Sequence, residues 1–206
     1  AVHIARSELL RKGYTLTQAT RIVKNAFNIK AEILPACEEN VQTYIKTSDG
    51  MMHFQEFWVL KKGKLDVEDI VFKGIGKAVA TDDVFRAMET SDAIVVGPSN
   101  PITSIMPIIS VKGIKRMLKK KFVVAVSPII GKKPVSGPAA KLMKAKGFEV
   151  SADGVADCYS DFLDLIVVHS GDRCNYKYVE TDIVMRDKKD EIRLAKFIVD
   201  LVKKYI

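Results

Sequence analysis

The stretch Ala93-Ile94-Val95-Val96-Gly97-Pro98-Ser99-Asn100-Pro101-Ile102-Thr103-Ser104-Ile105 decides the fold. Its first four residues form a short apolar run with two β-branched valines, which is typical of a fully buried strand. The run ends at Gly97-Pro98, where the chain must turn, and a helical pattern follows. Small polar side chains therefore lie between the carboxyl end of a strand and the start of a helix. In open α/β sheets, ligands bind at this position.

The polar residues of this turn are candidates for a phosphate site. Four side chains with a hydroxyl or amide group fall within six positions, and together with helix-start amides such groups suit a phosphate. The alternative is that they only cap a helix and shape a turn, since turn chemistry alone explains such residues. The density of polar groups favours a site. We assign nucleotide or phosphate binding to Gly97, Ser99, Asn100, Thr103 and Ser104.

A second strand with the same ending follows. Residues 122–126 are a buried apolar run that leads into Ser127-Pro128. A glycine-bearing loop then reaches Ser136-Gly137-Pro138, where Pro138 fits the first helical turn and Ser136 its cap. We expect the two strands to be parallel neighbours whose carboxyl ends face one cleft. Ser127, Ser136 and Gly137 therefore join the predicted nucleotide or phosphate site.

Helices and strands alternate along the chain. The pattern predicts helices at about 2–12, 16–27, 82–90, 138–146, 154–161 and 188–205, and further strands at 148–150, 163–168 and 178–185. Alternation of this kind indicates a parallel sheet with right-handed crossovers. We predict an α/β fold with a Rossmann-like, open, mostly parallel sheet that is flanked by helices.

Residues 31–75 have a different, β-rich character. The pattern predicts a strand at 31–35, a hairpin that turns at Ser48-Asp49-Gly50 and continues as a ribbon through residue 59, and a strand at 70–72. We expect this antiparallel ribbon to be inserted in a single domain of residues 1–206. Alternation on the ribbon places Phe54 and Trp58 on one face, where they are either core residues or stack on a flat ligand.

The composition limits the class of protein. With 48% hydrophobic residues among 206, the chain can bury a proper core. A net charge of +8 attracts nucleic acid or an anionic substrate. The lysines are spread in short runs without interleaved aromatics, which favours a solvated surface and no nucleic-acid partner. No apolar run approaches the length of a membrane span. Three cysteines without a C-x-x-C spacing argue against a disulfide framework and fit a reducing cytoplasm.

The common nucleotide and metal motifs are absent from the sequence. Neither G-x-G-x-x-G nor G-x-x-x-x-G-K-[ST] occurs. The three histidines have no ligand spacing. The acidic residues of 153–164 are better explained by helix capping and solvation than by metal binding. We assign no metal ligand.

Several motifs in order along the chain resemble the 2-phospho-L-lactate transferase family. The resemblance covers essentially the whole chain. The matching motifs are His3-Ile4 with Arg6–Leu10, Gly13–Thr17, Met52–Trp58, Gly97–Ile105, Val124–Gly131, Val135–Ala139 and Gly154–Asp157.

The resemblance implies a reaction and its partners. The family transfers a 2-phospholactyl or phosphoenolpyruvyl group from a guanosine diphosphate-linked donor to the deazaflavin alcohol Fo. The products are coenzyme F-420-0 and GMP, and the reaction uses Mg²⁺. The resemblance implies that Fo is contacted by His3, Ser7, Phe54 and Trp58. It also implies a cytoplasmic location and no nucleic-acid or membrane partner. A homodimer is one option.

One departure from the family leaves alternatives open. The family opens with a glycine-rich strand–loop–helix and metal-binding aspartates, which these residues do not contain. The first residues already form a helical stripe without a capping residue, so we expect an amino-terminal third to be absent and this chain alone to have little or no activity. The alternatives are an inactive fragment, or a non-catalytic nucleotide-sugar-binding regulator of a related family that shares the Thr-Ser-Ile after the turn. Asn100-Pro101 and Phe57-Trp58 favour the transferase.

Overall fold

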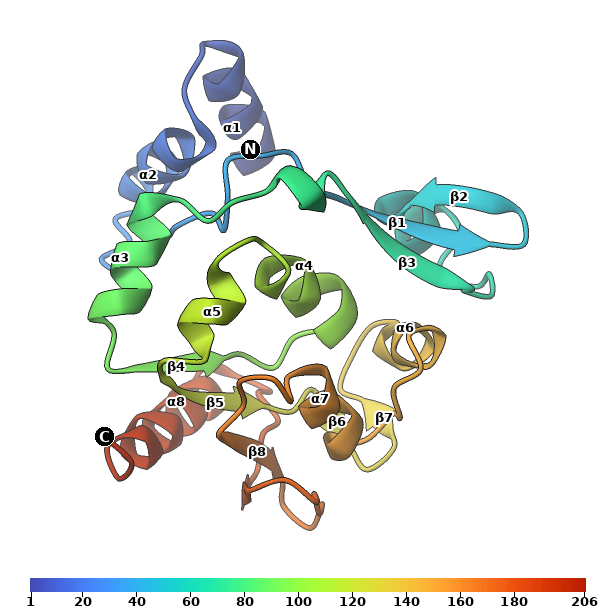
Figure 1. Ribbon diagram of the computed structural model, residues 1–206, viewed down its shortest axis with the longest axis vertical. Helices are drawn as coiled ribbons and strands as arrows, with labels where there is room; N and C mark the ends of the chain where they lie inside the picture. The colour runs from blue at the N-terminus through green and yellow to red at the C-terminus, as the bar shows by residue number, and fades with distance from the viewer.

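The centre of the computed structural model, which describes residues 1–206, is a four-stranded sheet in the order β4-β5-β8-β9 (Figure 1). The strands are β4 (Ala93–Val96), β5 (Phe122–Val126), β8 (Leu165–His169) and β9 (Tyr178–Thr181). Every neighbouring pair is parallel, with Val95 opposite Val124 and Val126 opposite Val167. The predicted α/β class and the predicted parallel pairing of β4 with β5 are confirmed. The prediction that residues 93–96 form a fully buried strand is wrong, because β4 lies at the edge of the sheet and Val95 is 49% exposed.

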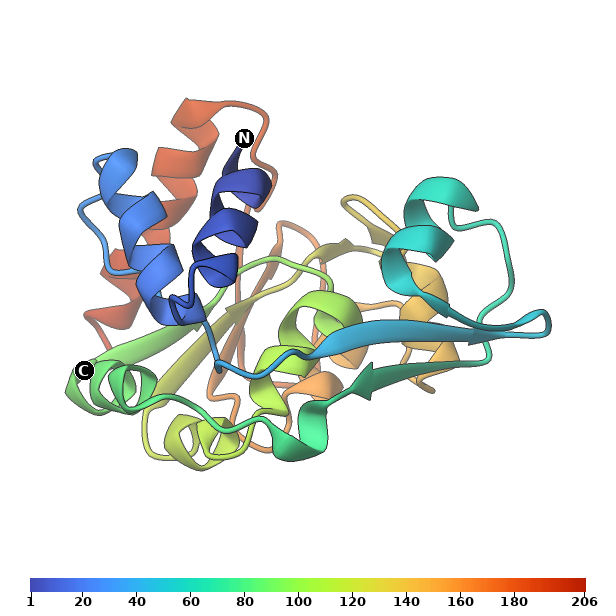
Figure 2. The same cartoon turned by 90° about the horizontal axis from the view of Figure 1, so that it is seen from above.

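Helices cover both faces of this sheet. Successive strand side chains point to opposite faces, so β5 divides its residues between two layers. Val124 and Val126 pack with α8 (Lys188–Val202), whereas Val123 and Ala125 belong to the larger cluster on the other face. In Figure 2 the red α8 and the yellow-green α5 (Ile114–Leu118) lie on opposite sides of the strands. The result is a three-layer arrangement.

The remaining helices follow the predicted pattern closely. Thr15 caps the second helix through a capping box: its Oγ1 accepts from the Gln18 amide at 3.2 Å, and Gln18 Oε1 accepts from the Thr15 amide at 2.9 Å. The further helices are α1 (Val2–Arg11), α2 (Leu16–Ala26), α3 (Asp82–Thr90), α4 (Met106–Ile109), α6 (Ala139–Ala145), α7 (Ala152–Cys158) and a 3-10 turn η2 (Ile75–Lys77).

A second, antiparallel sheet has the order β2-β1-β3. It comprises β1 (Gln42–Thr47), β2 (Gly50–His53) and β3 (Asp69–Lys73), which confirms the predicted hairpin. Ile45 and Ile70 of this sheet share one core cluster with Val123 and Ile166 of the parallel sheet. The short strands β6 (Ile129–Ile130) and β7 (Lys133–Pro134) form a separate hairpin. The division into one domain with an inserted 31–75 region stays a prediction.

Three predicted strand segments are wrong. Beyond residue 53 the ribbon becomes the helical turn η1 (Glu56–Leu60), where the Lys61 amide bonds to the Glu56 carbonyl at 3.0 Å and Phe57 is fully buried. Burial of that ring overrides the strand preference of aromatic residues. Residues 148–150 pair with no strand; they follow the end of α6, where the Phe148 amide bonds back to the Met143 carbonyl at 2.9 Å. Residues 31–35 pair with no strand.

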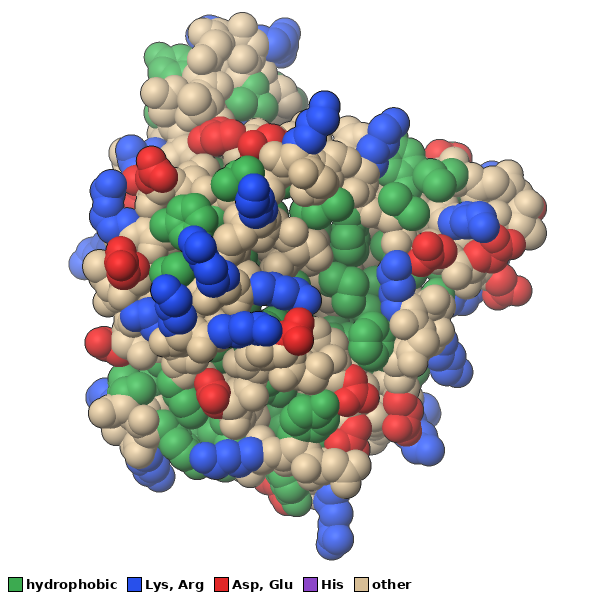
Figure 3. All heavy atoms as spheres, in the orientation of Figure 1, with side chains coloured by type: hydrophobic (Ala, Val, Ile, Leu, Met, Phe, Trp, Pro, Cys, Tyr) green, Lys and Arg blue, Asp and Glu red, His purple; other side chains and the backbone are tan.

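The amino-terminal helical pair projects from the rest of the molecule. Helix α1 has no buried residue and packs on α2 at the top of Figure 1. Figure 3 shows Lys and Arg side chains gathered over the left half of the displayed face, with acidic side chains among them. Lys115 and Asp161, for example, form an exposed ion pair at 3.0 Å. None of the helices combines the length and the apolar character needed to cross a bilayer.

Candidate functional site

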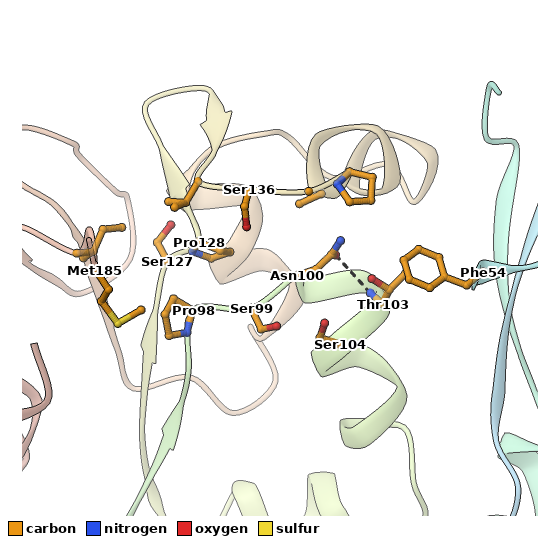
Figure 4. A pocket seen from close by; sticks show the side chains of 15 residues that line it. Phe54, Pro98, Ser99, Asn100, Thr103, Ser104, Ser127, Pro128, Ser136 and Met185 are labelled. Atoms are coloured by element: carbon orange, nitrogen blue, oxygen red, sulfur yellow. Dashed lines mark hydrogen bonds between the residues drawn. The ribbon is translucent and has the colours of Figure 1, made fainter. Parts of the chain in front are cut away.

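A pocket of about 370 Å³ lies at the carboxyl ends of β4 and β5 (Figure 4). Its lining comes from the turn after β4, the loop after β5, the segment after β9 and one residue of the antiparallel region. All predicted nucleotide- or phosphate-binding residues except Gly97 line it. The predicted cleft at the ends of two neighbouring strands is therefore present, as expected for a ligand site in an open α/β sheet.

The turn after β4 contributes three hydroxyl groups and one amide. Asn100 caps the helical turn η3 (Pro101–Ile105), since its Oδ1 accepts from the amides of Ile102 at 3.0 Å and Thr103 at 3.3 Å. This capping fixes the carboxamide and leaves its Nδ2 as a donor without a partner. The hydroxyl groups of Ser99, Thr103 and Ser104 make no hydrogen bond within the chain and line the open pocket.

The loop after β5 uses its first hydroxyl differently. Ser127 is fully buried, and its Oγ donates to the Ile129 carbonyl at 3.0 Å and accepts from the Ile129 amide at 3.1 Å. The side chain lies at the pocket wall, but its hydroxyl hydrogen is already donated to the Ile129 carbonyl of the same turn. Ser127 therefore shapes the pocket and has little donor capacity left for a ligand.

Ser136 and Gly137 line the pocket from the far end of the same loop. The prediction that Ser136 caps the following helix is wrong, because α6 begins at Ala139 with Pro138 at the capping position. Gly137 has φ +72°, a left-handed conformation that turns the chain before the helix starts and keeps Ser136 outside it. The Ser136 hydroxyl has no partner in the chain and lies in the pocket wall (Figure 4).

Apolar side chains that sequence reasoning missed close one end of the pocket. Ile183 and Met185 follow β9, which ends at Thr181 and not at residue 185 as predicted. Nothing in the local sequence marks these residues as part of a site. Only the parallel placement of β9 beside β8 brings its carboxyl end to the pocket. Phe54 lines the opposite end, as Figure 4 shows.

Gly97 lies outside the pocket. Its carbonyl accepts from the Ser99 amide at 2.8 Å, so it tightens the turn that presents the hydroxyl groups. It also lines a separate apolar groove of about 500 Å³ beside β4, together with Ile105 and Ile108. The structure thus separates Gly97 from the other seven predicted residues, and its phosphate-binding role stays a prediction.

No charged side chain lines the pocket. The nearby acidic residues of 153–164 are bound elsewhere: Asp153 Oδ1 accepts from the Asn175 amide at 2.7 Å, and Asp157 Oδ1 accepts from the Tyr176 hydroxyl at 2.8 Å. Burial, together with Asp153, raises the pKa of the Cys174 thiol to about 11, so that thiol is neutral at pH 7. The polar part of the pocket lining therefore consists of uncharged hydroxyl, amide and backbone groups.

Comparison with known proteins identifies the family. The model of the family described as 2-phospho-L-lactate transferase CofD matches residues 1–201. The chain belongs to this family. It is 46% identical over 209 aligned positions to the 2-phospho-L-lactate transferase of Methanosarcina acetivorans, covering 98% of this chain and 68% of the relative. To the enzyme of that name from Methanosarcina mazei it is 52% identical, covering 85% of this chain and 58% of the relative.

A more distant relative is 39% identical, the 2-phospho-L-lactate transferase of Methanocaldococcus jannaschii, of which the chain covers 67%. The chain thus spans roughly three fifths to two thirds of the length of these relatives. Among solved structures, a protein member of the UPF0052 family from Bacillus halodurans aligns with a TM-score of 0.67 at 14% identity, covering 93% of this chain and 70% of that chain. This likeness supports the fold alone.

The predicted Fo-binding residues of the family motifs do not meet at the pocket. His3 and Ser7 lie on the projecting α1, where His3 Nδ1 is 3.3 Å from Arg6 Nη2. Trp58 lies in η1 with 40% of its surface exposed and does not line the pocket. Phe54 alone does. The premise that Phe54 and Trp58 share one face of an extended ribbon is wrong, because residues 56–60 are helical.

The donor set of the pocket does not fit a Mg²⁺ ion. Magnesium prefers carboxylates together with phosphate oxygens, and no Asp or Glu lines the pocket. No group of three or more His, Cys, Asp or Glu side chains in the chain has the arrangement of a metal site. The hydroxyl and amide donors of the pocket suit a phosphate group itself.

Proposed function

We propose that this chain forms the phosphate-holding part of a 2-phospho-L-lactate transferase active site. The proposed reaction moves a 2-phospholactyl or phosphoenolpyruvyl group from a guanosine diphosphate-linked donor to the deazaflavin Fo, giving coenzyme F-420-0 and GMP. Family membership and the names of the relatives support this assignment. The observation that carries it is the set of hydroxyl groups without partners at the carboxyl ends of β4 and β5.

The pocket matches what phosphoryl transfer asks of a protein. Such reactions need little covalent chemistry from side chains, and catalysis rests on positioning and on stabilising charge. Ser99, Thr103, Ser104 and Ser136 each offer a hydroxyl donor, and Asn100 offers a fixed Nδ2. Neutral donors at the start of a helical segment hold phosphate oxygens without a competing carboxylate.

The transfer step itself is a displacement at phosphorus. The hydroxyl oxygen of Fo forms a bond to the phosphorus that carries the lactyl or enolpyruvyl group. The bond from that phosphorus to the bridging oxygen of the diphosphate breaks and GMP leaves with the bonding electrons, while the Fo hydroxyl proton is released. Within this scheme the hydroxyl groups of the pocket orient the phosphates. None of them accepts the proton or forms a covalent intermediate.

Equilibrium binding separates the proposal from a nucleotide-sugar-binding regulator. The chain is titrated with Fo, with guanosine diphosphate (GDP) and with a nucleotide sugar. We expect the chain to bind both Fo and GDP, and we expect Ser99→Ala to lower its affinity for GDP. Ser110→Ala, a change at an exposed serine outside the pocket whose hydroxyl is also unbonded, serves as the control and leaves GDP binding unchanged. Binding of the nucleotide sugar without Fo would favour the regulator and contradict the transferase.

A further inference from the structure

We propose that Lys141 of α6 positions one wall of the pocket: its ammonium group holds the loop that follows η1, and through that loop it holds Phe54. Lys141 itself does not line the pocket, so its role is that of a positioning residue. The inference goes beyond the proposed function in what it says of the fold, and it rests on the proposed function where it concerns ligand binding.

The wall at Phe54 belongs to a different part of the fold from the rest of the pocket. Phe54 directly follows β2 of the antiparallel sheet, whereas Pro138 and Ala139 lie at the start of α6. In Figure 1, α6 lies between the antiparallel sheet and the hairpin of β6 and β7. A contact between α6 and the segment after β2 therefore sets the distance across the pocket.

Lys141 makes this contact with three consecutive backbone carbonyls. Its Nζ donates to the carbonyls of Gly63 at 3.1 Å, Lys64 at 3.1 Å and Leu65 at 2.8 Å. An ammonium group carries three hydrogens, so these bonds use all of its donors. The start of α6 thus lines the pocket, and the same helical turn grips the loop after η1.

The loop is curled so that its carbonyls converge on one point. Lys62 and Gly63 both have left-handed backbones, with φ +54° and φ +63°. A Cβ atom at Gly63 would lie 2.9 Å from the indole ring of Trp58, so a side chain here would displace that ring. The Gly63 amide also donates to the Phe57 carbonyl at 2.9 Å. The loop therefore packs as one unit with η1.

Phe54 lies at the other end of the same unit. Its ring centroid is 6.5 Å from that of Phe57, and Phe57 is fully buried. Two attachments therefore hold the segment of residues 54–65: the Phe57 ring in the core, and the Lys141 ammonium at the loop. Without the second attachment the segment can tilt away from α6, and Phe54 moves with it.

Backbone carbonyls, and not an ion pair, hold the Lys141 side chain. Asp66 Oδ1 is 3.7 Å from Nζ, but Asp66 is fully exposed, and exposed ion pairs contribute little. The loop itself carries three further ammonium groups, those of Lys61, Lys62 and Lys64. Their charges oppose the approach of the Lys141 side chain. The three carbonyl bonds therefore account for its position, and Asp66→Asn separates the two explanations.

Trp58 reports on this loop, because it is the only tryptophan of the chain and its ring packs against Gly63. The test measures quenching of its fluorescence by acrylamide. In Lys141→Met we expect the quenching constant to rise about twofold, because the released loop uncovers the indole ring. Lys144→Met, at an exposed lysine of the same helix without a partner, is the matched control and leaves the constant unchanged. Lys141→Arg should restore part of the protection, since a guanidinium still donates to carbonyls.

Titration of the same variants with GDP and with Fo tests the positioning role. In Lys141→Met we expect the affinity for at least one of the two ligands to fall about threefold or more, because a displaced wall loses contact with the ligand. Lys144→Met and Asp66→Asn should bind as the wild type does.

Three results would overturn the inference. The first is unchanged Trp58 quenching in Lys141→Met, and the second is an equal rise in Asp66→Asn. The third is increased quenching with unchanged affinity for both ligands, which would make Lys141 a structural residue only. A wild-type chain that binds neither ligand contradicts the proposed function, and the quenching experiment then still decides whether Lys141 holds the loop.

Discussion

The turns after β4 and β5 look alike in sequence and differ in what they do with their hydroxyl groups. Both follow an apolar strand of the parallel sheet, and both combine serine with proline. After β5, the Ser127 hydroxyl closes its own turn through two hydrogen bonds to Ile129. After β4, the Asn100 side chain caps the helical turn, and the hydroxyl groups of Ser99 and Thr103 remain without partners.

The difference separates a hydroxyl that is used by its own turn from hydroxyl groups that remain available to a ligand. A hydroxyl that satisfies buried backbone groups contributes to stability, and its removal leaves those groups unpaired. A hydroxyl that faces a pocket costs nothing to the fold when removed, because water replaces it in the free protein. Removing hydroxyl groups from each turn, with stability and binding both measured, therefore tests the comparison directly.

The largest expected effect is on binding at the turn after β4. In the proposed complex, Thr103→Val and Ser99→Ala would each remove one hydrogen bond to a charged phosphate oxygen, worth about 1.5–3 kcal/mol. We expect each variant to bind GDP at least tenfold more weakly, and turnover in a complete transferase with the same change to fall by about tenfold or more. Stability measured by urea unfolding should stay the same. A lower unfolding free energy with unchanged affinity would mean that these residues only build the turn.

The second effect is on stability at the turn after β5. Ser127→Ala removes both hydrogen bonds of a fully buried hydroxyl and leaves the Ile129 amide and carbonyl unsatisfied. We expect the free energy of unfolding to fall by about 1–3 kcal/mol. The affinity of the folded variant for GDP should change less than threefold. A large loss of affinity without a loss of stability would place Ser127 with the residues after β4.

These two turns also show what the sequence was able to predict. Parallel strands have continuous apolar runs, so the pattern predicts β4, β5 and their pairing. It does not predict that β4 lies at the edge of the sheet with Val95 half exposed. Hydrophobic periodicity likewise predicts α3 and α8. The dense polar turn after β4 predicted a pocket at this edge of the sheet, because four hydrogen-bonding side chains exceed what a turn requires. The hydrogen bonds of the Ser127 hydroxyl to Ile129 were not predictable, since only the folded loop brings these groups together.

Other parts of the site lay beyond sequence reasoning for physical reasons. Met185 follows an ordinary strand, and only the parallel packing of β9 on β8 brings it to the pocket. Phe57 and Trp58 have strand propensity, but burial of Phe57 against the core favours a helical turn. Neither of these long-range packing effects can be predicted from the neighbouring residues in the sequence.

A third, smaller effect separates the two roles of Asn100. Asn100→Ala removes the cap of two backbone amides, and we expect the unfolding free energy to fall by about 1 kcal/mol. Asn100→Asp keeps the capping oxygen, so the stability loss should largely disappear. The negative charge of the new carboxylate should nevertheless lower the affinity for GDP at least tenfold. Full GDP affinity in Asn100→Asp would show that the Asn100 side chain does not face a phosphate.

The smallest effect concerns the ion pair that joins the end of α6 to the antiparallel sheet. Lys146, just past α6, lies 2.7 Å from Asp69 of β3, and this contact holds the pKa of Asp69 below its ordinary value of 3.8. Because the folded pKa is lowered, the stabilisation is present above pH 3.8 and is lost as the pH falls through the folded pKa. Since both side chains are partly exposed, solvent screening limits the contribution to less than about 1 kcal/mol.

Urea unfolding of Asp69→Asn and wild type across pH 2 to 7 checks this effect. The two unfolding curves should differ slightly at pH 7 and converge at low pH. A difference that grows as the pH falls would contradict the assigned ion pair.

A crystal structure of the chain with GDP bound tests the proposed phosphate site most directly. We expect oxygens of the diphosphate to lie within about 3 Å of the Ser99 and Thr103 hydroxyl groups, which is hydrogen-bonding distance. The Ser127 hydroxyl should keep its bonds to Ile129 in the same crystal. A diphosphate bound away from the turn after β4, with those hydroxyl groups still facing solvent, would contradict a phosphate site at this turn.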